Sequence, residues 1–236
     1  MRRHTQDMSL NAISIDCATE TLSICLQAHK AFWSFAKTAG LMHAQSVAPW
    51  IEKLCDDAGI CPADLDLIVA GIGPGSFTGL RIGLATAKGL ALGASCSIVG
   101  VSGLDSFGWK LKSFHGVVVP VIDAKKNRLY SALYQKGQRI SDYLDVSEDN
   151  LLSILSTESE KEILLTGPYA HRFYERISQG KVKAAFSLDP LYNSINPCIM
   201  LELGLERLAS TGDQGDSVMP LYLRKSEAEI KRENKR

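Results

Sequence analysis

The sequence carries no net charge, because 26 lysines and arginines balance 26 aspartates and glutamates. Proteins that bind nucleic acid mainly by neutralising phosphates usually have a basic excess, so the balance argues against autonomous nucleic-acid binding. No apolar run approaches the ~20 residues that a membrane helix needs, and residues 1–7 lack the apolar core of a signal peptide. We therefore expect a cytoplasmic protein that does not contact a membrane.

Motifs for metal binding and nucleophilic catalysis are also missing. The histidines are widely spaced and form neither an HExxH nor an HxxxH pair, and Ser76 does not lie in a GxSxG elbow. No CxxC pair occurs, which favours buried thiols in a reducing compartment over disulfides or zinc. We therefore expect no catalytic residues and no metal ligands. The six cysteines are Cys17, Cys25, Cys55, Cys61, Cys96 and Cys198.

The composition, with 45% hydrophobic and 22% charged residues, is typical of a folded globular chain. In the first half, hydrophobic periodicity predicts an antiparallel meander of three strands, then a helix, a buried strand, a second helix and another buried strand. Pro49 either lies in the first turn of a helix from Ser46 or kinks a helix that starts nearer His43. The expected strands are 10–16, 22–26, 31–38, 65–70 and 97–101, and the helices end at Gly59 and span 78–94.

The second half repeats the first, since the pattern I-D-x5-L-x3-L at Ile15 recurs at Ile122, although coincidence is an alternative for so few positions. Both copies are followed by helix-like segments and a buried strand. We therefore predict an α/β fold of two duplicated lobes, each led by a β-hairpin, with mixed sheets flanked by helices. The expected parts are a flexible N-terminus over 1–9, an N-terminal lobe over 10–108, a C-terminal lobe over 109–215, and a segment and tail over 216–236 that pack back on the N-terminal lobe. The expected elements of the second copy are a helix over 147–155, a strand over 162–166, a helix after Pro168, and a helix from Asn196-Pro197 to Leu208.

The segment GIGPGSFTG from Gly71 to Gly79 follows a buried strand and precedes a helix. Glycines permit close backbone approach, and helix N-termini hold anions. However, Pro74 and Ser76 break the dinucleotide fingerprint, and no GK[ST] end follows. A structural turn, capped by Ser76 or Thr78, is therefore favoured over a phosphate loop.

The helix after this segment has a stripe of small residues on one face. Interior glycines weaken a helix by roughly 0.5–1 kcal/mol each relative to alanine, and close approach of another helix offsets that cost. The second helix belongs either to the same chain or to another subunit, and composition does not separate the two. The stripe comprises Gly79, Gly83, Thr86, Leu90 and Gly93.

Several separated segments together resemble one protein family. The segment ISIDCATE from Ile13 resembles its AIDTSTE opening, and the helix at His43 resembles its HS…LLP helix. The segment GPGSFTGLRIG from Gly73 is its most specific signature, and VIDAK from Val121 and PLYLR from Pro220 match its IDAR and P-Y-R segments. The resemblance covers nearly the whole chain, and the family is TsaB, also called YeaZ.

The resemblance implies the actin-like ATPase fold, built from two ribonuclease-H-like lobes, in agreement with the internal repeat. It implies a noncatalytic subunit that activates TsaD in forming threonylcarbamoyladenosine at position 37 of tRNA, with the small ATPase TsaE joining them. It also implies that tRNA is bound only through the complex, that no cofactor is intrinsic, that ATP or ADP lies at the interface of the assembled complex, and that a homodimer forms when TsaD is absent.

The first hairpin departs from the family pattern, because Asp-Thr-Ser-Thr is here Asp16-Cys17-Ala18-Thr19. Two hydroxyls that could contact phosphate are missing, so Asp16 and Thr19 are the candidate cofactor-binding residues. Asp16 ends a strand, where carboxylates of nucleotide-metal sites often lie, although aspartates are also common in turns. The resemblance further indicates that the helices 43–58 and 78–94 bind TsaD or a second copy. The candidate interface residues are His43, Val47, Trp50, Gly79, Gly83, Thr86 and Leu90.

Two other classes of function are alternatives. An independent enzyme of the actin-like fold, a kinase or a peptidase, needs a second phosphate hairpin and an adenosine-binding glycine motif. The second hairpin here, around Lys125, is basic rather than rich in glycine or hydroxyls. A tRNA-binding module is disfavoured by the balanced charge.

Overall fold

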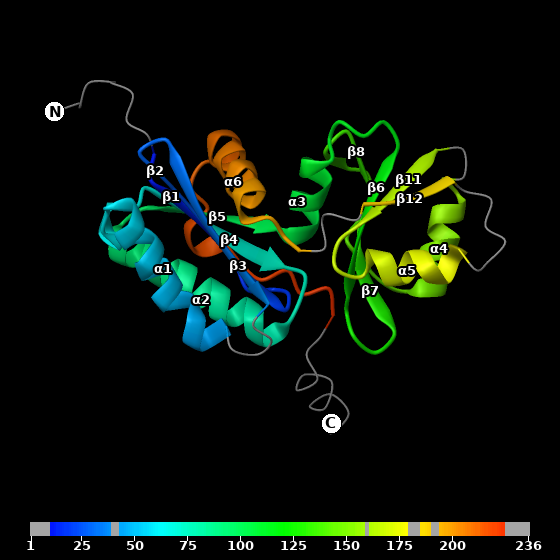
Figure 1. Ribbon diagram of the computed structural model, residues 1–236, viewed down its shortest axis with the longest axis horizontal. Helices are drawn as coiled ribbons and strands as arrows, with labels where there is room; N and C mark the ends of the chain where they lie inside the picture. The colour runs from blue at the N-terminus through cyan, green and yellow to red at the C-terminus, as the bar shows by residue number, and fades with distance from the viewer. Residues whose placement is uncertain (1–9, 39–42, 159–160, 179–184, 190–193, 225–236) are drawn as a thin grey trace.

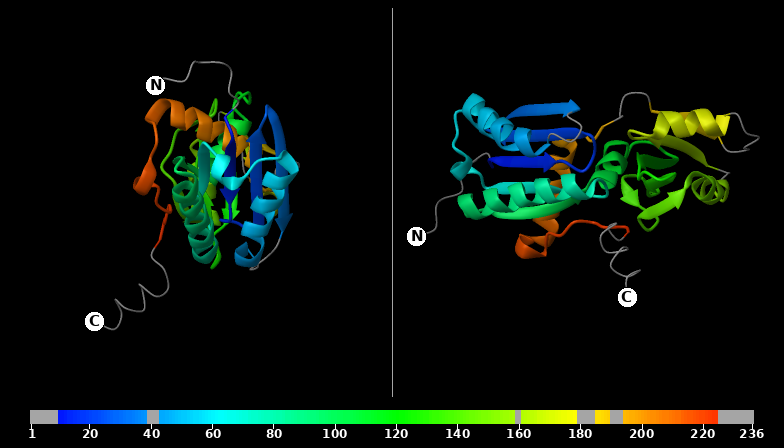
Figure 2. Two further views of the ribbon diagram at one scale, coloured as in Figure 1. Left: turned by 90° about the vertical axis from the view of Figure 1, so that its left-hand side faces the viewer. Right: turned by 90° about the horizontal axis from the view of Figure 1, so that it is seen from below.

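The computed structural model describes residues 10–38, 43–158, 161–178, 185–189 and 194–224 (Figure 1). The chain forms two α/β lobes that lie side by side along the long axis of the molecule (Figure 2, right). The expected N-terminus over 1–9 and the tail over 225–236 lie outside the described residues. No helix in the described part of the chain combines the length and the apolarity that crossing a membrane requires.

The N-terminal lobe is built on a five-stranded sheet in the order β3-β2-β1-β4-β5. The first three strands are antiparallel, as predicted, whereas β4 and β5 run parallel to β1. Strand residues alternate between two cores: Ile13 and Ile15 pack toward α1 and α2, and Ala12 packs toward α6 on the other face (Figure 1). The elements are β1 (Ala12–Asp16), β2 (Thr21–Ala28), β3 (Ala31–Thr38), α1 (His43–Ala58), the short 3₁₀ helix η1 (Pro62–Asp64), β4 (Leu67–Gly73), α2 (Phe77–Ala94), β5 (Ser97–Ser102) and α6 (Pro197–Thr211).

The C-terminal lobe repeats this topology. Its main path has the order β10-β7-β6-β11-β12, which matches the N-terminal lobe strand for strand, and the hairpin β8–β9 is added beside β6. The predicted duplication is therefore confirmed, and with it the actin-like ATPase fold of two ribonuclease-H-like lobes. The elements are β6 (Val117–Asp123), β7 (Arg128–Ser131), β8 (Tyr134–Gln135), β9 (Gln138–Arg139), β10 (Leu144–Ser147), α4 (Glu148–Ser156), β11 (Glu162–Thr166), α5 (Ala170–Ser178) and β12 (Ala185–Leu188).

Helix α3 (Gly103–Lys110) joins the two lobes. Its Asp105 carboxylate accepts hydrogen bonds of 2.8 Å from the hydroxyls of Tyr134 and Tyr143 in the C-terminal lobe, and it pairs with Arg207 of α6 at 3.3 Å. Gly108 allows the buried Tyr134 ring to pack directly on the helix, because a Cβ at this position would clash with the ring. One apolar cluster thus continues from the first lobe into the second.

Local signals in the sequence placed most element ends correctly. Ser76 caps α2 and Asn196 caps α6 with side-chain oxygens that accept backbone N–H groups, as predicted. Helix α1 starts at His43 and contains Pro49, and Gly59 follows it with φ +69°. The elements that were not predicted are helix α3, the strands β8, β9, β10 and β12, and the short 3₁₀ helices η1 and η2 (Gly215–Ser217).

Candidate functional site

The carboxylate of Asp16 at the end of β1 points into the protein. Its side chain is fully buried, Oδ2 accepts a hydrogen bond from the backbone N–H of Ala18 at 3.2 Å, and Oδ1 has no partner. Oδ1 lies so close to Gly71 that a Cβ there would clash with it. Burial raises the pKa of Asp16 to about 7, although the Ala18 N–H acts to lower it. A carboxylate that contacts phosphate or a metal must reach the ligand, whereas this one is enclosed in the chain alone, so a cofactor-binding role for Asp16 stays a prediction.

Thr19 and His43 hold the first hairpin against α1. The Thr19 hydroxyl accepts a hydrogen bond from the backbone N–H of Thr21 at 3.3 Å within the turn. The Nε2 atom of His43 lies 2.9 Å from the carbonyl oxygen of Thr19, which only accepts, so Nε2 carries the proton. His43 is 4% exposed and Val47, one turn later, is 3% exposed. Both side chains are used inside the chain, and their assignment to a partner interface stays a prediction.

The glycine-rich segment closes on the first hairpin instead of forming an open phosphate loop. Ser76 donates its backbone N–H to the carbonyl of Ala18 at 2.8 Å. A Cβ at Gly75 would clash with the same carbonyl, and a Cβ at Gly79 would clash with the carbonyl of Cys17. The hairpin backbone thus lies where an anion would meet the N-terminus of α2. The structural turn favoured from the sequence is confirmed, with Ser76 as the cap.

The first half of the small-residue stripe on α2 contacts the same hairpin. Gly79 and Gly83 are buried, and a Cβ at Gly83 would lie 3.3 Å from the Cβ of Cys17. The expected close approach is real, but its partner is the turn after β1 rather than a helix of another subunit. That Gly79 and Gly83 face a partner chain stays a prediction, and within this chain both pack on the first hairpin.

The second half of α2 is accessible. Cβ atoms at Gly89 and Gly93 would meet no atom within 4 Å, and Leu92 is 84% exposed. Thr86 and Leu90 are half-buried beside this strip. We call Ala85, Gly89, Leu92 and Gly93, which are all exposed, the α2 strip.

Trp50, the remaining predicted interface residue, is half-buried on α1. Its ring stacks on Phe35 of β3, with 3.6 Å between the ring centroids. Trp50 thus packs on the edge strand β3, while part of its surface remains accessible.

A segment that follows α6 covers the glycine-rich loop, and we call residues 212–224 the C-terminal strap. The backbone N–H of Leu221 donates to the carbonyl of Ile72 at 2.8 Å. The Tyr222 ring stacks on Phe77 at the start of α2, with 4.4 Å between centroids. Arg224 donates to the carbonyl of Ala124 at 2.6 Å in the C-terminal lobe. Residues 216–224 therefore lie against the N-terminal lobe and reach the second hairpin.

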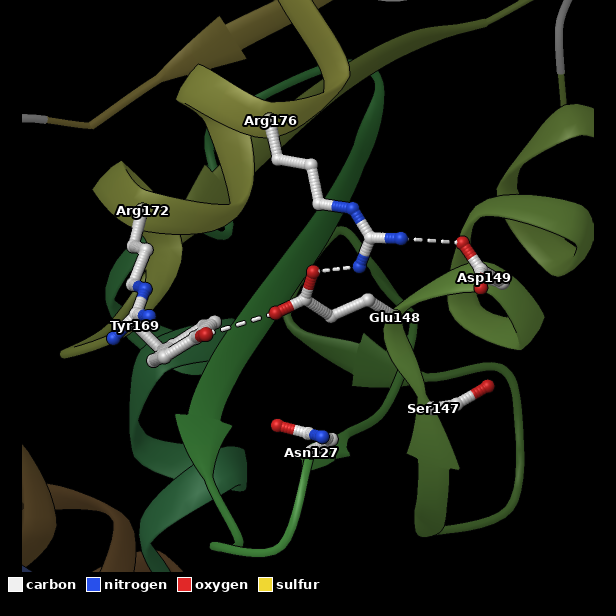
Figure 3. A pocket seen from close by; sticks show the side chains of 7 residues that line it. All are labelled: Asn127, Ser147, Glu148, Asp149, Tyr169, Arg172 and Arg176. Carbon is white, nitrogen blue, oxygen red and sulfur yellow. Dashed lines mark hydrogen bonds and ion pairs between the residues drawn. The ribbon is translucent and has the colours of Figure 1, made fainter.

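A pocket of about 450 Å³ lies in the C-terminal lobe between α4 and α5 (Figure 3). Arg176 pairs with Glu148 and, at 2.6 Å, with Asp149, and the Tyr169 hydroxyl donates to Glu148 at 2.8 Å. Arg172 lies over the Tyr169 ring. The two arginines face two carboxylates, so the pocket has no excess of either charge. Its lining residues are Asn127, Ser147, Glu148, Asp149, Tyr169, Arg172 and Arg176.

The two hairpins meet across the gap between the lobes. Lys125 of the second hairpin pairs with Glu20 of the first at 3.3 Å and with Asp123 at 3.1 Å. Asp123, the counterpart of Asp16, also accepts the backbone N–H of Lys125 at 2.7 Å. Within the described ranges, no three His, Cys, Asp or Glu side chains gather as a metal site would require.

Comparison with known proteins identifies the family. The sequence profile of the family described as TsaD, tRNA N6-adenosine threonylcarbamoyltransferase, matches residues 37–193. The chain belongs to this family. The TsaB protein of Bacillus subtilis (strain 168), named for tRNA threonylcarbamoyladenosine biosynthesis, is 26% identical over 226 residues, which are 94% of this chain and 97% of that protein. TsaB of Escherichia coli (strain K12) is 33% identical over 132 residues, or 55% of this chain and 57% of that protein.

Solved structures agree with these sequence relatives. YeaZ from Pseudomonas aeruginosa has a TM-score of 0.72 with 23% identity, covering 91% of this chain and 100% of that one, which shows the shared fold. The resemblance to the TsaB (YeaZ) family predicted from the sequence is thus confirmed. Two features of this member had no signal strong enough to predict them: the pocket in Figure 3, whose residues are scattered along the chain, and a contact between Cys25 and Cys198.

Proposed function

We propose that this chain is a noncatalytic subunit that activates a TsaD-type transferase in forming threonylcarbamoyladenosine at position 37 of tRNA. The family match and the near full-length similarity to a protein named TsaB support membership in that tRNA modification system. We also propose a cytoplasmic location, where tRNA is modified in bacteria.

The observation that carries the noncatalytic role is the closure of the first hairpin on the glycine-rich loop. In this arrangement Asp16 is sealed and the N-terminus of α2 is covered by the hairpin backbone at Cys17 and Ala18. A phosphotransfer enzyme would use such a carboxylate and such a helix N-terminus to bind a nucleotide, whereas here both contact other parts of the same chain. Peptidase chemistry lacks support as well, since the described residues contain no cluster of metal-ligand side chains.

ATP or ADP, which the resemblance places at the interface of the assembled complex, does not fit a site made by this chain alone. Thr19 keeps its hydroxyl in a turn hydrogen bond, and Asp16 cannot reach a ligand. We therefore propose that a nucleotide in the complex is held mainly by residues of the partner.

We further propose that the α2 strip, with the exposed part of α1, is the surface that binds TsaD, or a second copy of this chain when TsaD is absent. Gly89 and Gly93 leave a shallow surface on which another helix can approach closely, and Leu92 offers an apolar side chain to bury. These residues replace Gly79 and Gly83 as the part of the predicted stripe that another chain can reach. TsaE is proposed to join the assembled pair.

The main test reconstitutes the reaction with full-length chain, TsaD and TsaE, tRNA and threonylcarbamoyl-AMP, and measures the modified nucleoside by mass spectrometry. We expect co-purification with TsaD, and modification that depends on adding this chain. The isolated chain should show no peptidase or ATPase turnover and should bind tRNA with a dissociation constant above about 1 µM. Equal modification without the chain, or ATPase activity that Asp16→Ala abolishes, contradicts the proposal and favours the independent enzyme.

The surface is tested separately with Gly89→Leu. The new side chain has open space, and leucine favours a helix over glycine by about 1 kcal/mol, so the isolated variant should melt at the same or a higher temperature. A leucine at the centre of the interface should cost at least ~2 kcal/mol, about 30-fold in affinity for TsaD. The matched control is Ala209→Leu, an exposed position on α6 on the opposite face of the sheet. If Gly89→Leu binds TsaD with unchanged affinity, α2 is not part of the interface.

A further inference from the structure

The start of α6 is fastened to the sheet by side chains from two neighbouring strands, β1 and β2. The buried hydroxyl of Ser14 on β1 donates to the carbonyl of Pro197 at 2.7 Å, and that of Ser23 on β2 donates to the carbonyl of Ile195 at 3.2 Å. Cys25 lies directly opposite Ser14 in the β1–β2 pairing and so faces the same side. This row of polar side chains fixes the position of the helix start above β2.

Two thiols that are far apart in the sequence meet at this junction. The Sγ atoms of Cys25 and Cys198 lie 2.9 Å apart, in hydrogen-bond contact, and both thiols are free. Cys25 is fully buried, whereas Cys198, in the first turn of α6, is partly exposed. An oxidant can therefore reach Cys198 but not Cys25.

The electrostatic surroundings of the two sulfurs differ. The hydrogen bonds from Cys25 and from the Ser34 side chain lower the pKa of the Cys198 thiol, against the effect of burial. The pKa of Cys25 is raised because its proton is held in the bond to Cys198 and because its sulfur is buried. Cys198 is therefore the nucleophile of the pair.

We propose that Cys25 and Cys198 are a redox-active pair that oxidised glutathione, or a peroxide, converts reversibly into an intramolecular disulfide. With oxidised glutathione, the Cys198 thiolate attacks one sulfur, forming a mixed disulfide and releasing one glutathione thiolate. The Cys25 sulfur then attacks the sulfur of Cys198, loses its proton to solvent, and releases the second glutathione. With a peroxide, Cys198 becomes a sulfenic acid, and attack by Cys25 releases water.

The disulfide would link β2 to α6 across 173 residues of chain. Because long loops lose much conformational freedom in the unfolded state when they are closed, the oxidised chain should resist unfolding more than the reduced chain. The pair lies on the α6 face of the sheet, opposite α1 and α2 (Figure 1). Oxidation should therefore change the stability of the chain without altering the proposed partner surface.

The test incubates the full-length folded chain in buffers of graded oxidised to reduced glutathione ratio. The remaining thiols are then alkylated under denaturing conditions, and the intact mass is measured. We expect a monomer that takes up four alkyl groups instead of six, a crosslinked peptide pair containing Cys25 and Cys198, and an unfolding midpoint shifted to higher urea. Dithiothreitol should restore six reactive thiols after denaturation. The Cys25→Ser variant should stop at a glutathione adduct on Cys198, and the control Cys96→Ser should still form the crosslink.

Three results would overturn the proposal. One is uptake of six alkyl groups under denaturing conditions by wild-type chain that was first incubated, folded, in excess oxidised glutathione. Another is wild-type chain that stops at the Cys198 adduct, which would show that Cys25 does not attack. The third is a first disulfide formed between two chains through the exposed Cys61. Each is read on wild-type protein, so none depends on a variant that folds.

Discussion

The buried Asp16 makes a quantitative prediction about stability and pH. Its pKa is about 7 in the folded chain, against an ordinary value of 3.8, because burial disfavours the charged form more than the Ala18 N–H stabilises it. The folded chain thus holds this proton at pH values where the unfolded chain has already released it. The contribution of Asp16 to stability is therefore intact below about pH 4 and is lost as pH rises through about 7.

The size of the effect follows from the difference between the two pKa values. About three pH units at about 1.4 kcal/mol each correspond to about 4 kcal/mol, an upper figure for a side chain that is fully buried. The side chain introduced by Asp16→Asn cannot ionise, so the variant should not lose this stability as the pH rises. The amide brings its own cost, of about 1–3 kcal/mol for a buried donor without a partner, but that cost does not depend on pH. The quantity to measure is therefore how the difference in the free energy of unfolding between Asp16→Asn and wild type changes with pH.

Urea unfolding of wild type and Asp16→Asn at about pH 4.5, 6 and 8 measures this quantity. We expect the free energy of unfolding of the variant to rise by at least ~2 kcal/mol relative to that of wild type between the lowest and the highest pH. Asp123→Asn is the matched control, since it makes the same change at the equivalent strand end, where the carboxylate is partly exposed and held by Lys125. A difference that stays constant within ~0.5 kcal/mol would refute the argument that burial of Asp16 raises its pKa.

Three further substitutions probe packing inside the chain. Gly83→Leu should lower the free energy of unfolding by about 1–3 kcal/mol, because its side chain would overlap the turn at Cys17; an unchanged melting temperature would contradict this. Asp105→Ala should cost at least ~2 kcal/mol in urea unfolding, since two tyrosine hydroxyls and Arg207 lose their acceptor; a near-neutral result would mean that the lobes do not depend on this junction. Tyr222→Ala should remove about 1 kcal/mol of stacking and speed proteolysis of the C-terminal strap, and equal cleavage rates would show that the stack does not hold it.

The sequence alone determined the features that depend on neighbours along the chain. Alternating apolar residues predicted the meander β1–β3, and the caps at Ser76 and Asn196 set two helix starts. The pattern repeated at Ile15 and Ile122 predicted two equivalent lobes, which the matching strand orders confirm. The segment from Gly73 identified the family, because it combines several unusual residues within a short span.

What each of these features contacts depends on how the whole chain packs. Periodicity shows that one face of α2 is small, but the burial of Gly83 against Cys17 and the exposure of Gly89 depend on where the first hairpin comes to rest. The burial of Asp16 likewise depends on Gly71, 55 residues later in the sequence.

The thiol pair shows the same limit at longer range. Cys25 and Cys198 are separated by 173 positions, and each alone is typical of a buried cysteine. They meet because the chain returns from the second lobe and places α6 on the sheet of the first. Hydrophobic patterns specify that a helix face must be covered, whereas the packing of the whole chain specifies which side chains then touch.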